Sequence, residues 1–543
     1  KWGLSAMGLL SFFDWLVIIT YLVGILAISA YFSTSLSNKR EYFVTANSYS
    51  AWPLATSVIA TQCSTNSILG APAFVAFAAG GGLVWLQYEL ALPLAMLISM
   101  IFIMPIIFSL RVISVYEYLE IRFDEKTRLL LSAFFLITRL IVASITVYGV
   151  SAVIQLISGL SFFSSVMIFG FVTVIYDLLG GIKAVIFSDV IQMLILVFIL
   201  LLVLNILISQ AGGLSELFSA LPDNRKIAID FKNHGFGDGQ DFSFWPMFIG
   251  GTLLYISYYM CDQSQIQRGL CAKNQNEAQK VLFINGLMRF PLVLLYCLIG
   301  VGLAGYAISN PDFINSLALD GSKPNYNLAV PIFLIEELPR GLVGLALVAL
   351  FAAAMSSLDS VINSLSAVSM DDFVRKFLNS RSWSDEQDLN CCRLLTVFWG
   401  GLALLGSFWV GDLASTVIIA VNKIGSLANG PILGVFTLGL LSKRTNGTSV
   451  CLAFIAGITL NSYFWIYMSG ISWLWWNLTG FMCTLISGYL ISYLHHPFQA
   501  PQKAVWTSSG FMELMSNSVP YVKYFILISW TIALITFLYF LGP

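Results

Sequence analysis

The stretch SVIATQCSTNSILGAP, residues 57 to 72, interrupts a long apolar run with seven Ser, Thr, Gln and Asn residues. A polar interruption of this kind is typical of a discontinuous helix, whose unwound carbonyls and amides can bind a solute where they line a cavity inside the protein. A continuous helix that packs closely through small residues is the alternative. Because small-residue packing does not call for Gln62, we favour the discontinuous helix.

The composition around this stretch indicates an all-α integral membrane protein. Of the 543 residues, 58% are hydrophobic and only 10% are charged, which excludes an ordinary soluble domain. The net charge of -1 gives no indication of a nucleic-acid partner. The cysteines show no metal-ligand spacing, and the few histidines form no recognisable pair of nucleophile and base. We therefore expect no enzyme activity.

Apolar runs long enough to cross a bilayer recur along the chain, and we count about fourteen of them. They form a single transport domain that covers residues 1–543. The first run exceeds the core of a signal peptide, so we expect a true span. Lys and Arg concentrate in alternate loops, which include those with Lys39, Arg111 and Lys443. By the positive-inside rule, this pattern places the N-terminus outside in a multi-pass protein of the plasma membrane, which we expect to be a bacterial inner membrane.

A second polar break, YYMCDQSQIQRG at residues 258 to 269, follows about five spans after the first. Two broken helices in corresponding positions of two five-span halves indicate an inverted-repeat transporter. We predict an extra N-terminal helix in residues 1–45 and a first repeat in 46–212. The second repeat covers 243–445, and additional C-terminal helices fill 446–543.

Four motifs carry a family resemblance: VYEYLEIRF at 115 to 123, LLGGIKAVIFSDVIQ at 178 to 192, QIQR at 265 to 268 and AAAMSSLDSVINS at 352 to 364. Together they resemble the sodium:solute symporter family, which includes sodium-coupled glucose, monocarboxylate, choline, proline and sialic acid carriers. The resemblance implies a LeuT-type core of two five-helix inverted repeats. It also implies import of a small polar solute with sodium by alternating access.

The resemblance further implies a sodium site between the first broken helix and the serine-rich helix. Its ligands are the carbonyls of Ala60, Cys63 and Ala353 and the hydroxyls of Ser356 and Ser357. Independently, a hard cation prefers several oxygen ligands of this kind. Cys63 departs from the usual aliphatic residue of the family, but only its carbonyl is used. The alternative is that the two serine hydroxyls bond back to their own helix.

A second sodium ion could be bound near Asp189, Asp359 and Ser360. Asp189 occupies the position of the family's aspartate in SDVIQ, and Asp359 replaces a hydroxyl of the sugar and sialic acid carriers in a manner reminiscent of choline carriers. We favour a second sodium site anchored by Asp189, for one or two sodium ions in total. The alternatives are that Asp189 pairs with a basic residue at the cytoplasmic rim, or that Asp359 holds a proton.

Arg139 gives the strongest indication of the solute, because an arginine inside an apolar span is costly unless it faces a cavity or an anion. Its planar guanidinium suits a carboxylate. Arg139 falls where bacterial sialic acid symporters have their carboxylate-binding arginine. The resemblance adds Gln62, Ser64, Ser67, Gln87, Gln263, Arg289 and Asn422 as further solute-binding positions. The alternative is an internally paired Arg139, with Glu89 as the expected partner.

These features predict a sodium-coupled symporter for a carboxylated solute such as sialic acid or a similar sugar acid. A simpler monocarboxylate is the second candidate and a neutral sugar or polyol is the third. From a different class, a membrane sensor or a channel would also place polar groups inside apolar helices. The expected partners are the solute and membrane lipid, and the oligomeric state stays open.

Overall fold

The computed structural model describes residues 10–34, 36–45, 48–318, 324–378, 383–410, 417–494, 501, 504–506 and 521–542. Nearly all of this described part is helical, and no strand occurs in it. Ten of its helices are long and apolar enough to cross a membrane. The all-α membrane fold predicted from the sequence is confirmed. Our count of about fourteen spans stays a prediction.

The helices of the first half of the core begin with α3 (Ala51–Gln62) and α4 (Thr65–Ala76). A composite helix follows from Leu83 to Ser109, made of η3 (Leu83–Leu90), α5 (Ala91–Ile98), η4 (Ser99–Ile103) and α6 (Met104–Ser109). The short α7 (Glu117–Arg122) leads into α8 (Glu125–Ser158) and α9 (Phe162–Ala211).

The second half of the core also begins with a broken helix. η5 (Pro246–Gly250) and α12 (Gly251–Met260) precede α13 (Gln263–Leu270), and α14 (Gln275–Ser309) follows. α17 (Leu342–Val368) continues into η8 (Ser369–Val374), and α19 (Asp385–Gly406) and α20 (Val417–Leu441) complete the core. The predicted repeat boundaries stay predictions.

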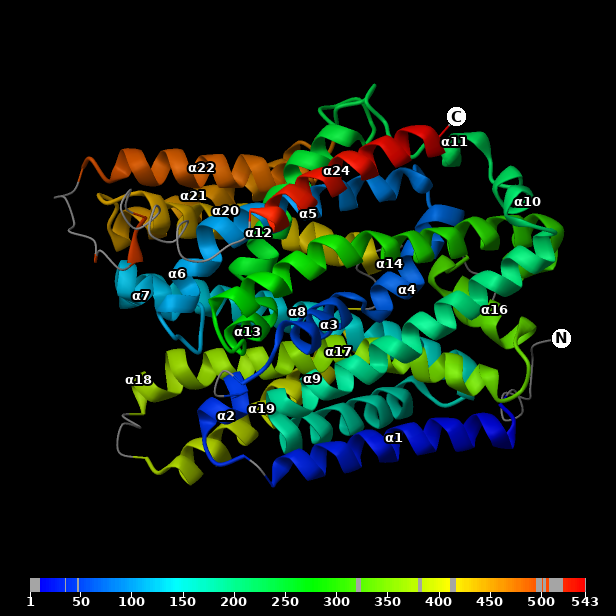
Figure 1. The fold of residues 1–543 in the computed structure, drawn as a ribbon, viewed down its shortest axis with the longest axis horizontal. Coiled ribbons are helices and arrows are strands. Elements are labelled where there is room, and N and C mark those ends of the chain that lie inside the picture. Colours follow the sequence, from blue (N-terminus) through cyan, green and yellow to red (C-terminus); the bar gives the residue numbers. More distant parts are fainter. Residues whose placement is uncertain are drawn as a thin grey trace.

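Among the described residues, the long helices outside this core are α1 (Phe12–Ser33), α21 (Gly447–Tyr467), α22 (Trp475–Ile491) and α24 (Val522–Leu541). Figure 1 shows α1 along one edge of the bundle and α21 and α22 along the opposite edge, with α3 and α17 in the interior. α1 packs against α9 and α17, while α21 and α22 pack against α20. The interior helices are therefore shielded from lipid, which allows them to carry polar groups.

Both polar breaks predicted from the sequence are confirmed. α3 ends at Gln62 and α4 begins at Thr65, so the first helix is interrupted at Cys63 and Ser64. The second interruption lies between α12 and α13, where the Asp262 side chain caps α13 by accepting a hydrogen bond from the backbone of Ser264 at 2.8 Å. Each interruption frees backbone groups in the interior of the bundle.

Helix α9 is 50 residues long and bends at Gly181, which divides it into two limbs. Gly181 has a φ of +53°, and a Cβ atom built there would lie 2.8 Å from the ring of Tyr42. Only glycine combines this conformation with so close a neighbour. The bend therefore turns one long apolar run into two segments that pack differently.

Candidate solute and sodium site

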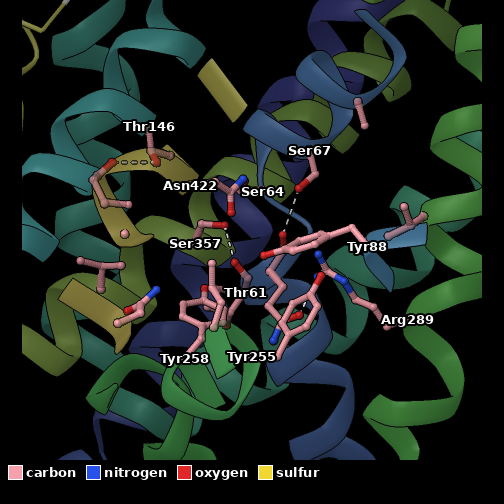
Figure 2. Close-up of a pocket in the computed structure, with 18 of the residues that line it drawn as sticks. Thr61, Ser64, Ser67, Tyr88, Thr146, Tyr255, Tyr258, Arg289, Ser357 and Asn422 are labelled. Carbon is pink, nitrogen blue, oxygen red and sulfur yellow. Dashed lines mark hydrogen bonds between the residues drawn. The ribbon is translucent and has the colours of Figure 1, made fainter. Parts of the chain in front are cut away.

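A cavity of about 140 Å³ lies beside the first helix break. Its walls come from α3, α4, η3, α8, α12, α14, α17 and α20. Figure 2 shows Ser64, Thr61 and Ser357 near its centre, with Arg289 on one side and Thr146 on the other. The lining alternates hydroxyls with aromatic rings, which suits a small polar solute with some apolar surface.

Most of the predicted solute-binding residues line this cavity, namely Gln62, Ser64, Ser67, Arg139, Arg289 and Asn422. The sequence reasoning missed several other lining residues, among them Thr61, Tyr88, Thr146, Tyr255, Tyr258 and Asn429. Thr61 and Tyr258 lie within the two polar breaks, whereas Tyr88, Thr146 and Asn429 lie in segments that no polar break marks. Their spacing along the chain gives no local signal that they meet.

Two predicted solute-binding residues, Gln87 and Gln263, lie elsewhere. Gln87 accepts a hydrogen bond from the backbone of Asp230 at 3.0 Å and is fully buried. Gln263 accepts from the backbone of Val115 at 2.8 Å and donates to the carbonyl of Ile113 at 2.7 Å. Both amides therefore satisfy backbone groups of neighbouring segments, and the structure does not bring them to the cavity lining.

Arg139 reaches the cavity with an internal partner, the carboxylate of Asp262. The two side chains are only 13% and 9% exposed, so the ion pair is largely desolvated. Our expectation that Glu89 would be the partner is wrong. Glu89 instead pairs with Arg289, whose Nε lies 3.3 Å from Glu89 Oε2. The helix break places Asp262 beside α8, and spacing along the sequence could not show this approach.

Arg289 is also held by Gln62. Its guanidinium donates to Gln62 Oε1 at 2.6 Å, and the Tyr259 hydroxyl donates to the same oxygen at 2.9 Å. The two arginines at the cavity are thus each matched by one carboxylate, Asp262 or Glu89. A solute that binds here meets guanidinium groups whose charge is already balanced.

Four of the five predicted sodium ligands, Ala60, Ala353, Ser356 and Ser357, are linked by hydrogen bonds where α3 ends against α17. The Ser356 hydroxyl donates to the carbonyls of Ala60 and Ala353, each at 3.1 Å. The Ser357 hydroxyl donates to the carbonyls of Ala353 at 3.1 Å and Thr61 at 2.8 Å. Neither serine donates to the carbonyl of Cys63, which lies in the break itself.

The alternative of hydroxyls that bond back to their own helix is realised in part, since both serines donate to Ala353 in the preceding turn. This geometry is compatible with a cation site. A hydroxyl that donates its proton to a carbonyl keeps its lone pairs available for an ion. Two helices therefore present several neutral oxygens to one buried point, which is the ligand set that sodium prefers.

Asp189, Asp359 and Ser360 form a second buried cluster next to these serines. The Ser57 hydroxyl donates to Asp189, whose other oxygen has no hydrogen-bond partner in the described part of the chain. Asp359 accepts from the Tyr176 hydroxyl at 2.7 Å and from Ser360 at 3.2 Å. All of these side chains are almost completely buried.

The basic residue of this cluster is Arg268, which is fully buried and not at the rim of the protein. Its guanidinium contacts the hydroxyls of Ser57, at 3.3 Å from Nε, and of Ser360. Hydroxyl groups thus separate Arg268 from both carboxylates. When both aspartates are ionised, Asp189, Asp359 and Arg268 together have one excess negative charge.

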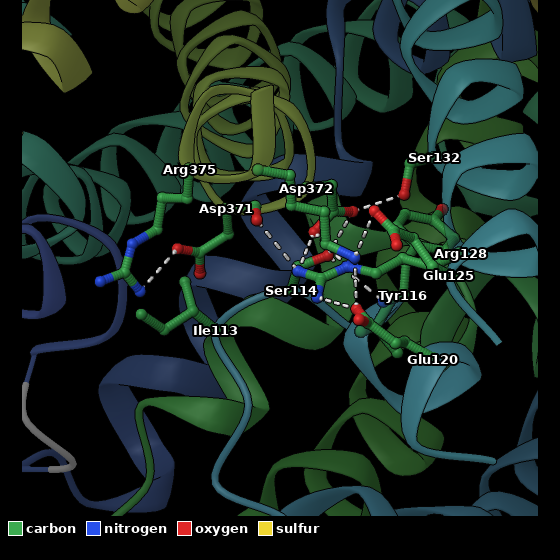
Figure 3. Close-up of polar contacts among 12 residues, drawn as sticks. Ile113, Ser114, Tyr116, Glu120, Glu125, Arg128, Ser132, Asp371, Asp372 and Arg375 are labelled. Atoms are coloured by element: carbon green, nitrogen blue, oxygen red, sulfur yellow. Dashed lines mark hydrogen bonds and ion pairs between the residues drawn. The ribbon is translucent and has the colours of Figure 1, made fainter. Parts of the chain in front are cut away.

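A network of charged residues joins the helices where α8 begins and α17 ends. Figure 3 shows Arg128 reaching from α8 between Asp372 and Glu120. Arg128 Nε lies 2.9 Å from Asp372, and Lys39 is paired with the neighbouring Asp371 at 2.6 Å. Burial raises the pKa of Glu120, but hydrogen bonds from Lys376 and Arg128 outweigh it, so this pKa lies below its ordinary value. Glu120, Arg128 and Asp371 of this network also line a hollow at this end of the bundle.

The broken helices, the cavity beside the first break and the oxygen cluster define a membrane transporter of the LeuT-type fold. A solved structure of a sodium-coupled sialic acid symporter, in its substrate-bound outward-open state, matches with a TM-score of 0.80 and 26% identity. The match covers 91% of this chain and 99% of that one. A nucleobase-cation-symport-1 family transporter shares the fold at a TM-score of 0.55 and 11% identity, over 84% of this chain and 95% of its own.

The chain belongs to the sodium:solute symporter family, whose model matches residues 42–457. It is a sodium-coupled transporter and not an enzyme. A putative sodium-dependent multivitamin transporter of Drosophila melanogaster is 26% identical, over 90% of this chain and 87% of its own length. A sodium/sialic acid symporter of Aliivibrio fischeri is 28% identical, over 88% and 92%. The human sodium-coupled monocarboxylate transporter 1 is 27% identical, over 84% and 73%.

Proposed function

We propose that this symporter imports a small carboxylated solute, a sialic acid or a similar sugar acid, together with sodium. The observation that carries the proposal is the Arg139 guanidinium in the lining of a cavity that also presents the hydroxyls of Ser64 and Ser67. A guanidinium binds a carboxylate, and hydroxyl and amide groups bind the polar substituents of a sugar. Gln62, Arg289 and Asn422 complete the proposed solute site.

A monocarboxylate without a sugar ring is the second candidate. The modest cavity volume of about 140 Å³ favours it, as does the likeness to the human monocarboxylate transporter. A neutral sugar or polyol ranks third, because it leaves Arg139 without a function in binding.

For sodium, we propose that the carbonyls of Ala60, Cys63 and Ala353 and the hydroxyls of Ser356 and Ser357 bind one ion. The hydrogen-bonded approach of both serines to α3 supports this set. We further propose a second sodium ion at Asp189, Asp359 and Ser360. The unpaired oxygen of buried Asp189 and the single excess negative charge of this cluster support it.

We also propose that the N-terminus lies outside, which places the charged network around Arg128 and Asp372 on the cytoplasmic side. The excess of Lys and Arg in alternate loops supports this orientation. Membership of the family establishes a multi-pass membrane transporter. The plasma membrane, and more narrowly the bacterial inner membrane, stays a prediction because the relatives come from bacteria and animals.

A thermal-shift screen tests the solute assignment. The purified protein is heated with sugars, sugar acids and monocarboxylates in sodium buffer and, separately, in potassium buffer. A ligand stabilises the folded protein in proportion to its occupancy of the site. We expect sialic acid or another carboxylate to raise the melting temperature in sodium only. Stabilisation by neutral sugars alone would contradict the proposal.

A further inference from the structure

The ion pair between Arg139 and Asp262 lies between two cavities. Arg139 lines the central cavity and also a smaller cavity of about 40 Å³, which Tyr116 and Phe135 line as well. Asp262 lines the smaller cavity and is not part of the central lining. The pair therefore lies where the two cavities adjoin.

Asp262 has two structural partners at the same time. Its Oδ1 accepts from the backbone N–H of Ser264 at 2.8 Å and from the Ser264 hydroxyl at 2.6 Å, which caps α13. Its Oδ2 faces Arg139 on α8. The pair thus ties the second half of a broken helix to a continuous helix of the bundle, while the cap alone would suffice to hold α13 together.

Arg139 needs an anion wherever it is buried, because an unpaired guanidinium at this depth is costly. In this structure Asp262 supplies that anion. A carboxylate on a solute in the central cavity would meet the same guanidinium from its other side. Asp262 and a solute carboxylate can therefore each supply the negative charge that the Arg139 guanidinium needs.

We propose that Asp262 stands in for the solute carboxylate, so that Asp262 and the solute compete for Arg139 and their exchange releases α13 from α8. This inference rests on the proposed function, a carboxylated solute. It makes Asp262 a specificity-determining residue, because a neutral analogue cannot replace the charge that Arg139 would lose. It also links solute binding to movement of a broken helix, as alternating access requires.

The test is the affinity of purified protein for sialic acid and for lactate in sodium buffer, measured by titration calorimetry. Asp262→Asn keeps a side-chain oxygen that can cap α13 but removes the competing charge. A competitor that occupies the binding group lowers apparent affinity by the fraction of free sites, so we expect this variant to bind the carboxylate about ten-fold more tightly. Ser264→Ala is the matched control, since it keeps the carboxylate and should bind like the parent.

Equal or weaker binding by Asp262→Asn would overturn the inference, because a residue that only orients Arg139 cannot raise affinity when its charge is removed. If the Asn variant is not recovered, Asp262→Ser offers another neutral capping residue. Failure of the proposed function has a different signature: neither carboxylate binds the parent, or Arg139→Gln binds them as tightly as the parent does.

Discussion

At the scale of single residues, we expect sodium binding to depend on the hydroxyls of Ser356 and Ser357, which donate to the carbonyls of Ala60 and Thr61. Replacing both serines by alanine removes two oxygen ligands from the proposed site. At about 1.5 kcal/mol for each contact with an ion, the loss is about 3 kcal/mol, roughly a hundredfold in sodium affinity. The measurement is the sodium concentration that gives half-maximal solute uptake.

Ser364→Ala is a suitable control for this double variant. Ser364 is buried on the same helix, and its hydroxyl donates only to the carbonyl of Val361, at 2.8 Å. The control should keep the parental sodium dependence. Unchanged sodium affinity in the double variant would show that these serines do not bind the ion.

We expect Arg139 to bind the carboxylate of the solute. Arg139→Gln should weaken binding of a carboxylated solute by about 2 to 5 kcal/mol, as for the loss of one partner of a buried charge pair. Binding of the corresponding neutral amide or alcohol should change much less, and lysine should be a poor substitute because it lacks the planar guanidinium. Calorimetric titration of both ligands measures the difference.

The variant Arg139→Gln also leaves Asp262 without its partner. The double variant with Asp262→Asn removes both charges and serves as the control for folding. Equal losses for the charged and the neutral ligand, in both variants, would make Arg139 a structural residue.

The sequence predicted that Arg139 lies in an apolar span and needs a partner, but it pointed to Glu89. The cost of burying Arg139 follows from the apolar sequence around it. The choice of its partner depends on how α8 and the second break pack together. The same limit applies to Gln87 and Gln263, which bind backbone groups of distant segments. The sequence could predict which buried polar residues need a partner. It could not predict which residue of another helix supplies that partner.

At the scale of helices, the two breaks were predictable because polar side chains interrupt apolar runs at both places. The bend of α9 lies at Gly181, in the stretch LLGGIK that separates two apolar runs of the sequence. The structure joins these two runs in one bent helix. At the bend Gly181 packs against Tyr42, from a short helix far earlier in the chain, and this contact could not be predicted from the local pattern.

The charged network at the end of the bundle should contribute to stability through Arg128 and Asp372. Asp372 is fully buried and also accepts from Ser114 at 3.0 Å and from Ser132. Asp372→Asn leaves a buried guanidinium partly unpaired, and breaking a buried pair costs about 3 to 5 kcal/mol. We expect a clear fall in melting temperature in detergent.

Asp223→Asn is the matched control, because Asp223 pairs with Lys226 at 2.8 Å but is 90% exposed. An exposed pair contributes little, so the control should melt like the parent. The role assigned to the network fails if Asp372→Asn melts at the same temperature as this control.

At the scale of the whole molecule, we expect the buried cluster of Asp189 and Asp359 to set the charge moved in each cycle. Two sodium ions with one monoanion move one net charge, which gains about 2.3 kcal/mol per 100 mV of membrane potential. We expect a solute-dependent current in proteoliposomes that contain the parent protein. Asp189→Asn should lower the ratio toward one sodium ion per cycle, and Asp359→Ser tests whether the second carboxylate is needed.

The current that accompanies transport of a monoanionic solute decides between one and two sodium ions per cycle. A parent protein that transports it without any current moves one sodium ion per cycle, and the second site would then be excluded. Current that persists unchanged in Asp189→Asn would place the second ion elsewhere.

We expect a sodium gradient to drive accumulation of a carboxylated solute through this protein. This is measured most directly by uptake of labelled sialic acid, with lactate as the second solute, into proteoliposomes under an inward sodium gradient. The internal concentration should transiently exceed the external one, and this excess should vanish when potassium replaces sodium and in the Ser356→Ala/Ser357→Ala variant. Flux that never exceeds equilibrium and does not depend on sodium, or accumulation of neutral sugars alone, would contradict it.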